Sequence, residues 1–267
     1  MTSDQKYKIR PNKRLGQNFL VDNDAIQKLI DAAELTKDDI VVEVGAGTGA
    51  LTTELAKRAK KVIAVEKDRV LIPVLKENTA ILKNLEILQG DILTLPISDM
   101  QYAIYKVVGN IPYYLTAPLI RKFLESENPP SRMVMMVQKE MAERICAEPP
   151  DMSILAVSVQ VYARPEIVAC VPRSSFWPQP HVDSAIVRIM DYESRIKNTE
   201  IFFKIVKAGF SSPRKQLINN LPHALDVERT EAEEWLLKCG IAPQRRAETL
   251  SVDEWKRVAT TFLEIKN

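Results

Sequence analysis

Metal-ligating and redox-active side chains are scarce in this sequence. Its 267 residues include only two histidines, His181 and His223, and three cysteines, Cys146, Cys170 and Cys239. Neither histidine belongs to an H-x-x-x-H or H-E-x-x-H pattern, and the cysteines are widely spaced and lack a C-x-x-C pair. The sequence therefore predicts neither a metal centre nor a disulfide framework, and we expect three reduced thiols.

Long apolar runs are lacking as well. The longest stretch without a charged residue, 107–120, spans 14 residues, whereas a membrane-spanning helix needs about 20 apolar residues. The amino terminus is basic from Lys6 onward and has no apolar run of signal-peptide length. We therefore expect a cytoplasmic protein without a membrane partner.

The chain also has no strong excess of charge of one sign. It carries 37 basic and 35 acidic residues, and this net charge of +2, taken alone, argues against a nucleic-acid partner. Hydrophobic residues make up 46% and charged residues 27%, which is typical of a globular protein. At this length we expect one sizeable domain and a smaller one.

From residue 40 onward, short β-branched runs alternate with helix-like segments. Strands are expected over residues 40–44, 61–65, 85–88, 106–108 and 133–137, and helices over 51–59, 69–78, 115–124 and 139–146. Two further strands, 166–171 and 184–190, are joined by a proline-rich turn and can form an antiparallel hairpin at the edge of the sheet. This order is typical of a doubly wound, Rossmann-like α/β sheet.

The character of the chain changes near residue 195. No β-branched runs follow, and apolar residues recur at helical spacing, as in Phe202, Ile205 and Val206. The sequence therefore predicts two domains, an α/β domain over residues 1–195 and a small all-helical domain over 196–267.

A glycine-rich loop follows the first predicted strand. Between Gly45 and Gly49, a tight turn can bring backbone N–H groups to a ligand at the start of the next helix. Gly45, Gly47 and Ala50 satisfy the pattern G-x-G-x-x-G/A, so a dinucleotide-binding oxidoreductase must be weighed. Glu66 ends the second strand, where a carboxylate can accept hydrogen bonds from both ribose hydroxyls of a nicotinamide or an adenosylmethionine cofactor.

Two more acidic residues favour S-adenosylmethionine over a nicotinamide. Glu43, two residues before the first glycine, suits the positively charged methionine end of that cofactor. Asp91, which follows the third strand, can accept a hydrogen bond from the adenine amino group. The sequence therefore predicts a cofactor site that contains Glu43, Gly45, Gly47, Glu66 and Asp91.

The tetrapeptide Asn110-Ile111-Pro112-Tyr113 follows the fourth strand, beside the predicted cofactor crevice. An exocyclic adenine amine is a poor nucleophile because its lone pair is delocalised into the ring. The Asn110 side-chain oxygen and the Ile111 carbonyl can accept from both N–H groups and favour a pyramidal nitrogen, with Pro112 fixing the turn. Tyr113 offers a flat face on which the base can stack, an interaction worth about 1–3 kcal/mol.

A second aromatic motif, Phe176-Trp177-Pro178-Gln179-Pro180, connects the last two strands. Its prolines are expected to hold it as a stiff loop with the aromatic side chains exposed at the rim. Phe176 is then placed to close the other face of an extruded base.

The ordered set of motifs resembles the KsgA (RsmA) family of rRNA adenine N6,N6-dimethyltransferases over nearly the whole chain. The residues that carry the resemblance are Leu15-Gly16-Gln17-Asn18-Phe19-Leu20, Glu43 to Gly49, Glu66, Gly90-Asp91, Asn110 to Tyr113, Phe176 to Pro180 with Val182 and Ser184, Arg214-Lys215 and Asn219-Asn220-Leu221. Single motifs are shared widely among methyltransferases, but the whole set is highly specific.

The resemblance implies dimethylation of two adjacent adenosines in a hairpin near the 3′ end of small-subunit rRNA, on a pre-30S particle during ribosome assembly. It implies contacts with S-adenosylmethionine by Asn18, Leu20, Gly45, Glu66, Asp91 and Asn110, with Gln17 nearby and Asn110 also serving catalysis. We expect a monomer that needs no metal and that contacts RNA through Lys13, Arg14, Arg214 and Lys215.

Three departures from the family pattern concern target recognition. His181 stands where lysine is common, and Pro213 stands where a second arginine is common. The segment 148–152 lacks the glycines expected there. None of the three touches a cofactor motif.

Other functions remain to be weighed against this one. An enzyme of the antibiotic-resistance type, acting on large-subunit rRNA, shares the Q-N-F-L motif and a motif like Asn110 to Tyr113, but Arg214-Lys215 and the 219–221 helix favour the small-subunit branch. A ribosome-assembly checkpoint module, which would mainly bind and for which catalysis is secondary, is the alternative from another class. The intact Asn110 and Tyr113 count against it. A nicotinamide dehydrogenase is disfavoured because nothing at 110–113 suits hydride transfer.

The near-neutral total charge averages over unlike regions. Residues 1–14 hold five basic residues against one acidic residue, and so do residues 197–220, which leaves the rest of the chain at −6. Each basic segment can neutralise RNA phosphates beside the cleft. We predict that replacing these lysines and arginines lowers the salt dependence of RNA binding, measured as the slope of log affinity against log salt; an unchanged slope would place the RNA elsewhere.

Overall fold

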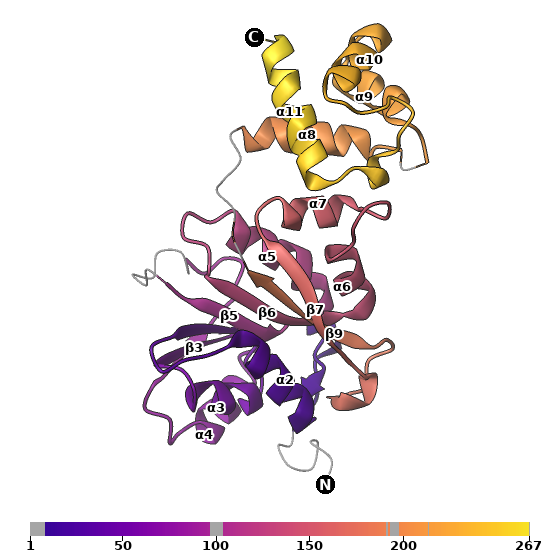
Figure 1. The fold of residues 1–267 in the computed structure, drawn as a ribbon. Helices are drawn as coiled ribbons and strands as arrows, with labels where there is room; N and C mark the ends of the chain where they lie inside the picture. Colours follow the sequence, from indigo (N-terminus) through magenta and orange to yellow (C-terminus); the bar gives the residue numbers. More distant parts are fainter. Residues whose placement is uncertain (1–8, 97–103, 191, 193–197, 213, 267) are drawn as a thin grey trace. The chain divides into compact units, whose positions relative to one another are not determined.

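The computed structural model describes residues 9–96, 104–190, 192, 198–212 and 214–266. These residues form two compact units (Figure 1), the first drawn from 1–142 and 164–192 and the second from 143–163 and 193–267. The strands are β1 (Phe19–Leu20), β2 (Ile40–Val44), β3 (Lys61–Glu66), β4 (Leu85–Gln89), β5 (Lys106–Asn110), β6 (Arg132–Gln138), β7 (Arg164–Val171), β8 (Phe176–Trp177) and β9 (Ser184–Met190).

The helices alternate with the strands in the first unit and stand alone in the second. The α-helices are α2 (Asn23–Ala33), α3 (Ala50–Ala56), α4 (Ile72–Asn78), α5 (Thr116–Leu124), α6 (Lys139–Ile145), α7 (Ile154–Gln160), α8 (Thr199–Gly209), α9 (Leu217–Leu225), α10 (Arg229–Lys238) and α11 (Val252–Lys266). Short 3-10 turns are η1 (Lys13–Leu15), η3 (Tyr113–Leu115), η4 (Arg173–Ser175) and η5 (Ala247–Thr249).

A seven-stranded sheet confirms the predicted α/β fold. Its strand order is β4-β3-β2-β5-β6-β9-β7. The first five strands in this order are parallel to one another. Strand β9 runs antiparallel to both of its neighbours, β6 and β7, and its pairing with β7 confirms the predicted antiparallel hairpin at the edge. Because the parallel strands end at the same edge, the loops after β2, β3, β4 and β5 meet there.

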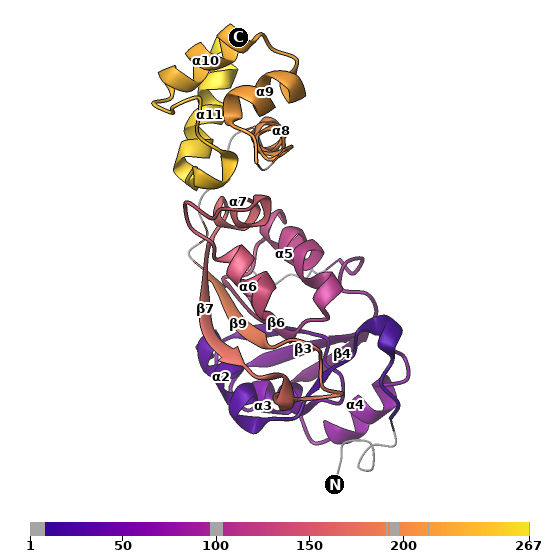
Figure 2. The same cartoon turned by 90° about the vertical axis from the view of Figure 1, so that its right-hand side faces the viewer.

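The sheet lies between two layers of helices (Figure 2), with α2, α3 and α4 on one face and α5 and the start of α6 on the other. The central strands are buried on both faces, which explains why they are near-continuous apolar runs in the sequence. Val41, Val62 and Val108, each 0% exposed, pack in one core with Leu29 of α2 and Leu55 of α3.

Two helices and two short strands of the fold were not predicted from the sequence. Helix α2 begins after Asp22, whose side chain accepts hydrogen bonds from the backbone N–H groups of Asp24 and Ala25. Helix α7 was also missed. The two-residue strands β1 and β8 pair antiparallel, with Leu20 opposite Phe176. Strands this short carry no periodicity that a sequence pattern can show.

The second unit confirms the predicted helical region. Phe202, Leu221, Trp235 and Trp255 are each at most 2% exposed and form its core, and the Trp235 indole N–H donates to the Val258 carbonyl at 2.9 Å.

The predicted boundary between 1–195 and 196–267 differs from the observed packing, because residues 143–163 pack with the C-terminal helices. The Tyr162 and Phe203 rings lie 6.2 Å apart, and the Met152 N–H donates to the Glu248 carbonyl at 3.0 Å. An insertion between β6 and β7 therefore belongs to the second unit. Within the described residues, no helix is long and apolar enough to cross a membrane.

Gly109 provides a test of the close approach between β2 and β5. A Cβ at this position would lie 2.5 Å from the Val44 carbonyl oxygen, a rigid backbone atom. We expect Gly109→Ala to lower the free energy of unfolding by about 1–3 kcal/mol, measured by urea unfolding. In the control Gly90→Ala, the new Cβ would meet only the Leu95 side chain at 3.2 Å, so an equal loss in both variants contradicts this explanation.

Candidate active site

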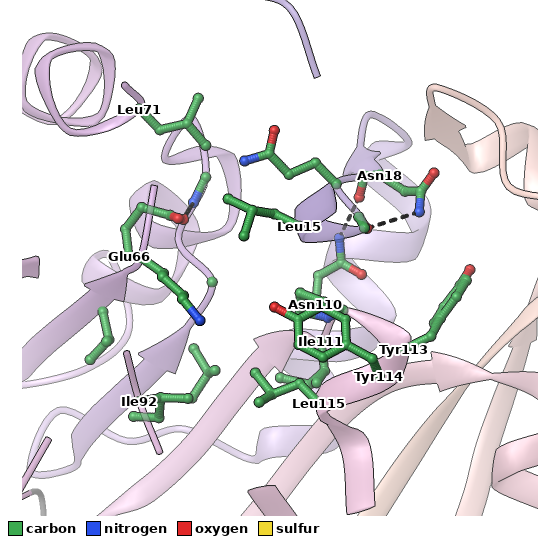
Figure 3. Close-up of a pocket in the computed structure, with 18 of the residues that line it drawn as sticks. Leu15, Asn18, Glu66, Leu71, Ile92, Asn110, Ile111, Tyr113, Tyr114 and Leu115 are labelled. Atoms are coloured by element: carbon green, nitrogen blue, oxygen red, sulfur yellow. Dashed lines mark hydrogen bonds between the residues drawn. The ribbon is translucent and has the colours of Figure 1, made fainter. Parts of the chain in front are cut away.

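A cleft opens at the carboxyl edge of the parallel strands (Figure 3). Its walls come from residues within 15–19, 44–47, 65–71, 90–92 and 110–115, and from Phe176. The cleft therefore lies where the sequence motifs were expected to meet.

The glycine loop turns sharply at one end of this cleft. Gly45, Gly47 and Gly49 all have positive φ, at +77°, +59° and +90°, a conformation that side chains disfavour. A Cβ on Gly45 would also lie 3.3 Å from the Asn110 carbonyl oxygen. Glycine is therefore needed both for the turn and for its close approach to the end of β5.

Glu66 ends β3 with its carboxylate in the wall of the cleft. The carboxylate accepts hydrogen bonds from the backbone N–H groups of Gly47 at 2.8 Å and Asp68 at 2.7 Å. The residue is 7% exposed, and burial raises the pKa of this carboxyl although the two backbone donors oppose the rise. Each oxygen retains a second lone pair with which it can accept from a ligand.

Glu43 lies beneath the cleft and not in its wall. It is 0% exposed, does not line the cleft, and neither carboxylate oxygen has a hydrogen-bond partner within the described residues. Burial raises the pKa of Glu43 to about 8, and the negative charge of Glu66 adds to the rise. The nearby Thr52 hydroxyl opposes the rise, although it does not form a hydrogen bond of normal geometry with the carboxylate. The predicted contact between Glu43 and the cofactor stays a prediction. The position of Glu43 outside the wall of the cleft does not support it.

Asp91 lines the cleft and is paired with a lysine. One carboxylate oxygen accepts from the Lys67 ammonium at 2.7 Å and the other from the Leu93 backbone N–H at 2.9 Å. The Lys67 ammonium is the main cause that lowers the pKa of Asp91. Adenine binding at Asp91 must therefore share or replace the contact with Lys67.

The N-terminal motif spans the cleft. The Asn18 carbonyl accepts from the Asn110 side-chain amide at 2.8 Å, and the Gln17 amide donates to Asp68 at 2.7 Å. Leu20 is instead 8% exposed in the core beside α2 and does not line the cleft. The structure thus brings Gln17 and Asn18 to the site and leaves the Leu20 side chain outside it.

The Asn110 motif follows β5 as expected. Because the Asn110 amide nitrogen donates to the Asn18 carbonyl, the side-chain oxygen is the group left to accept from a substrate. Figure 3 shows Asn110 and Ile111 at one side of the cleft and Glu66 at the other. The Tyr113 hydroxyl lies 3.2 Å from the Ser184 hydroxyl, and burial raises the pKa of Tyr113.

The expectation that the aromatic residues of the 176–180 motif are exposed at the rim is wrong for Phe176. It lines the cleft but is only 4% exposed, because β8 pairs with β1 and directs its side chain into the core. Its neighbour Trp177 stacks on Phe19, with ring centroids 6.1 Å apart.

Several residues that line the cleft were not singled out from the sequence. Lys67 and Leu71 follow the second strand, and Tyr114 follows the Asn110 to Tyr113 motif. Tyr114 is 54% exposed. Proximity to Tyr113 was the signal available for Tyr114, whereas the role of Lys67 depends on a contact with Asp91, 24 residues away.

The residues predicted to contact RNA fall in both units. Arg14 is exposed in the first unit, and Arg214 and Lys215 are exposed in the second. The main chain of Lys13 lies in η1, and Pro213 lies outside the described residues. In the part of the chain that the structure describes, no group of His, Cys, Asp and Glu side chains has the arrangement of a metal site.

The burial of Glu43 predicts a pH dependence of stability. Because its pKa rises from 4.5 to about 8, the folded chain keeps a proton that the unfolded chain loses, so this residue destabilises the fold as the pH rises from 4.5 to 8. We expect Glu43→Gln to be more stable relative to the parent at pH 8 than at pH 5, by about 1 kcal/mol or more. Urea unfolding at both pH values measures this difference. The exposed Glu77 gives the control Glu77→Gln, and a pH-independent effect of Glu43→Gln contradicts the prediction.

Comparison with known proteins identifies the family of this chain. The family model for ribosomal RNA adenine dimethylase matches residues 9–264. Ribosomal RNA small subunit methyltransferase A is 43% identical in Dehalococcoides mccartyi, covering 97% of this chain and 90% of the relative, and 42% identical in Clostridioides difficile, covering 94% and 90%.

Solved structures show the same fold. A dimethyladenosine transferase from Plasmodium falciparum has a TM-score of 0.79 at 27% identity, covering 92% of this chain and 98% of its own. The 23S rRNA methyltransferase ErmE has a TM-score of 0.74 at 28% identity, covering 91% and 99%. The chain therefore belongs to the ribosomal RNA adenine dimethylase family.

Proposed function

We propose that this protein is an rRNA adenine N6,N6-dimethyltransferase that modifies two adjacent adenosines in the 3′-terminal hairpin of small-subunit (16S) rRNA during 30S ribosome biogenesis. The observation that carries the proposal is the orientation of Asn110. Its amide nitrogen is held by the Asn18 carbonyl at 2.8 Å, so its oxygen is available to an amino group in the cleft.

The cofactor that fits the cleft is S-adenosyl-L-methionine, which supplies an activated methyl group on a sulfonium. Glu66 would hold the ribose hydroxyls and Asp91 the adenine amino group, since both carboxylates line the cleft. The backbone of Gly45 and Gly47 and the Asn18 segment would hold the methionine end. The carboxylates of Glu66 and Asp91 favour this ligand because it is a cation.

The residues after β5 would bind the target base. The Asn110 side-chain oxygen and the Ile111 carbonyl accept from the adenine amino group and favour the pyramidal nitrogen that attacks. Tyr113 stacks on one face of the base, and Phe176, which lines the cleft, closes the other face. Because the methyl group is already activated, the chain needs no covalent nucleophile and no metal.

The small subunit is the favoured target over the large subunit. Relatives named small subunit methyltransferase A share 38–43% identity with this chain, against 28% for ErmE. A checkpoint role that needs binding alone is the second candidate, and the intact site at Asn110 and Tyr113 counts against it. We propose that the enzyme works as a monomer in the cytoplasm on a pre-30S particle, with Lys13, Arg14, Arg214 and Lys215 on RNA phosphates.

Labelled S-adenosylmethionine tests the reaction and the target together. We expect label on 30S particles from a strain that lacks the modification, mapped to two adjacent adenosines, and none on 50S particles. Asn110→Ala should abolish transfer because it removes the amine acceptor, while urea unfolding and RNA binding stay near the parent values. Label on 50S particles contradicts the proposed target, and near-normal transfer by Asn110→Ala contradicts its catalytic role.

A further inference from the structure

The segment Leu15–Asn18 crosses the cleft and is hydrogen-bonded to both of its walls. On one side, Gln17 Nε2 donates to Asp68 Oδ2 at 2.7 Å, just after β3. On the other side, the Asn18 carbonyl accepts from Asn110 Nδ2 at 2.8 Å, at the end of β5. Figure 3 shows Leu15 between Glu66 on one side and Asn110 on the other, so this segment covers the space between the walls.

Both polar ends of the Gln17 side chain are used to hold this segment. Besides its bond to Asp68, Gln17 Oε1 accepts from the Asn12 backbone N–H at 2.7 Å. The Asn12 carbonyl in turn accepts from the N–H groups of Leu15 at 3.1 Å and Gln17 at 3.4 Å. Residues 12–17 therefore form one turn, and Gln17 ties that turn to the opposite wall. Gln17 also lines the cleft, so its side chain holds the turn and borders the ligand site at once.

Asp68 joins this turn to the predicted ribose-binding residue. Its Oδ1 accepts from the Val70 N–H at 3.0 Å, which fixes the carboxylate, while Oδ2 accepts from Gln17. The Asp68 backbone N–H donates to Glu66 Oε1 at 2.7 Å. Because Asp68 is a carboxylate, its bond to the Gln17 amide is charge-assisted and stronger than a bond between neutral groups.

We propose that Gln17 and Asp68 form a latch that holds residues 15–18 across the cleft and slows the release of the ligand beneath it. The proposal rests on the proposed function only in taking S-adenosylmethionine as that ligand. Both are positioning residues, because neither needs to touch the reacting atoms. Loss of one charge-assisted hydrogen bond corresponds to about a tenfold change in the opening equilibrium.

The test is the dissociation rate of radiolabelled S-adenosylmethionine, chased with an excess of unlabelled compound. We expect Gln17→Ala and Asp68→Ala each to release the label about ten times faster than the parent. The double variant should release it no faster than either single variant, because both remove the same interaction. Asp68→Asn has one acceptor oxygen for two donors, the Val70 N–H and Gln17 Nε2, so it should release the label faster than the parent and no faster than Asp68→Ala.

A matched control comes from a second glutamine–aspartate pair. Gln27 Nε2 donates to Asp31 Oδ1 at 2.5 Å on α2, and neither residue lines the cleft. We expect Gln27→Ala to release the label at the parent rate. An equal acceleration in this control, or effects of Gln17→Ala and Asp68→Ala that add in the double variant, would overturn the latch.

The outcomes for the latch and for the proposed function differ. If the parent protein binds no labelled S-adenosylmethionine, the proposed function fails and the latch fails with it. If the parent binds the label and the Gln17→Ala and Asp68→Ala variants release it at the parent rate, only the latch fails.

Discussion

The close approach of two backbone segments, the end of β2 and the end of β5, underlies the rest of the site. A Cβ on Gly109 would lie 2.5 Å from the Val44 carbonyl oxygen, and one on Gly45 would lie 3.3 Å from the Asn110 carbonyl oxygen. The missing side chains let the glycine loop and the Asn110 motif share one cleft. A wider separation would leave a cofactor and an amine acceptor too far apart for a direct transfer between them.

The three carboxyl groups near the cleft are controlled in three different ways. Glu43 is fully buried without a partner, Glu66 is buried but accepts from two backbone N–H groups, and Asp91 is paired with Lys67. Burial therefore favours the neutral form of Glu43, while the lysine favours the charged form of Asp91. The environments of Glu43 and Asp91 thus favour opposite protonation states, although both are acidic residues in the sequence.

The sequence was sufficient where local pattern and fold agree, and insufficient where distant residues decide. The β-branched runs predicted the parallel strands, because strands buried on both faces must be apolar. The burial of Phe176 depends on pairing with Leu20, more than 150 residues away, so no local pattern shows it. The burial of Glu43 and the contact between Lys67 and Asp91 likewise depend on packing between strands. Helix α2 is the exception, since Asp22 is an N-cap signal that can be found in the sequence.

The small sheet of β1 and β8 links two segments that border the cleft. It joins the segment that holds Asn18 to the segment that holds Phe176, through Leu20 opposite Phe176 and the stacked rings of Phe19 and Trp177. Ordering of one segment therefore orders the other. If a ligand restrains one of these segments, ordering of the other costs less, and by thermodynamic reciprocity a ligand at the other segment favours the first ligand by the same factor.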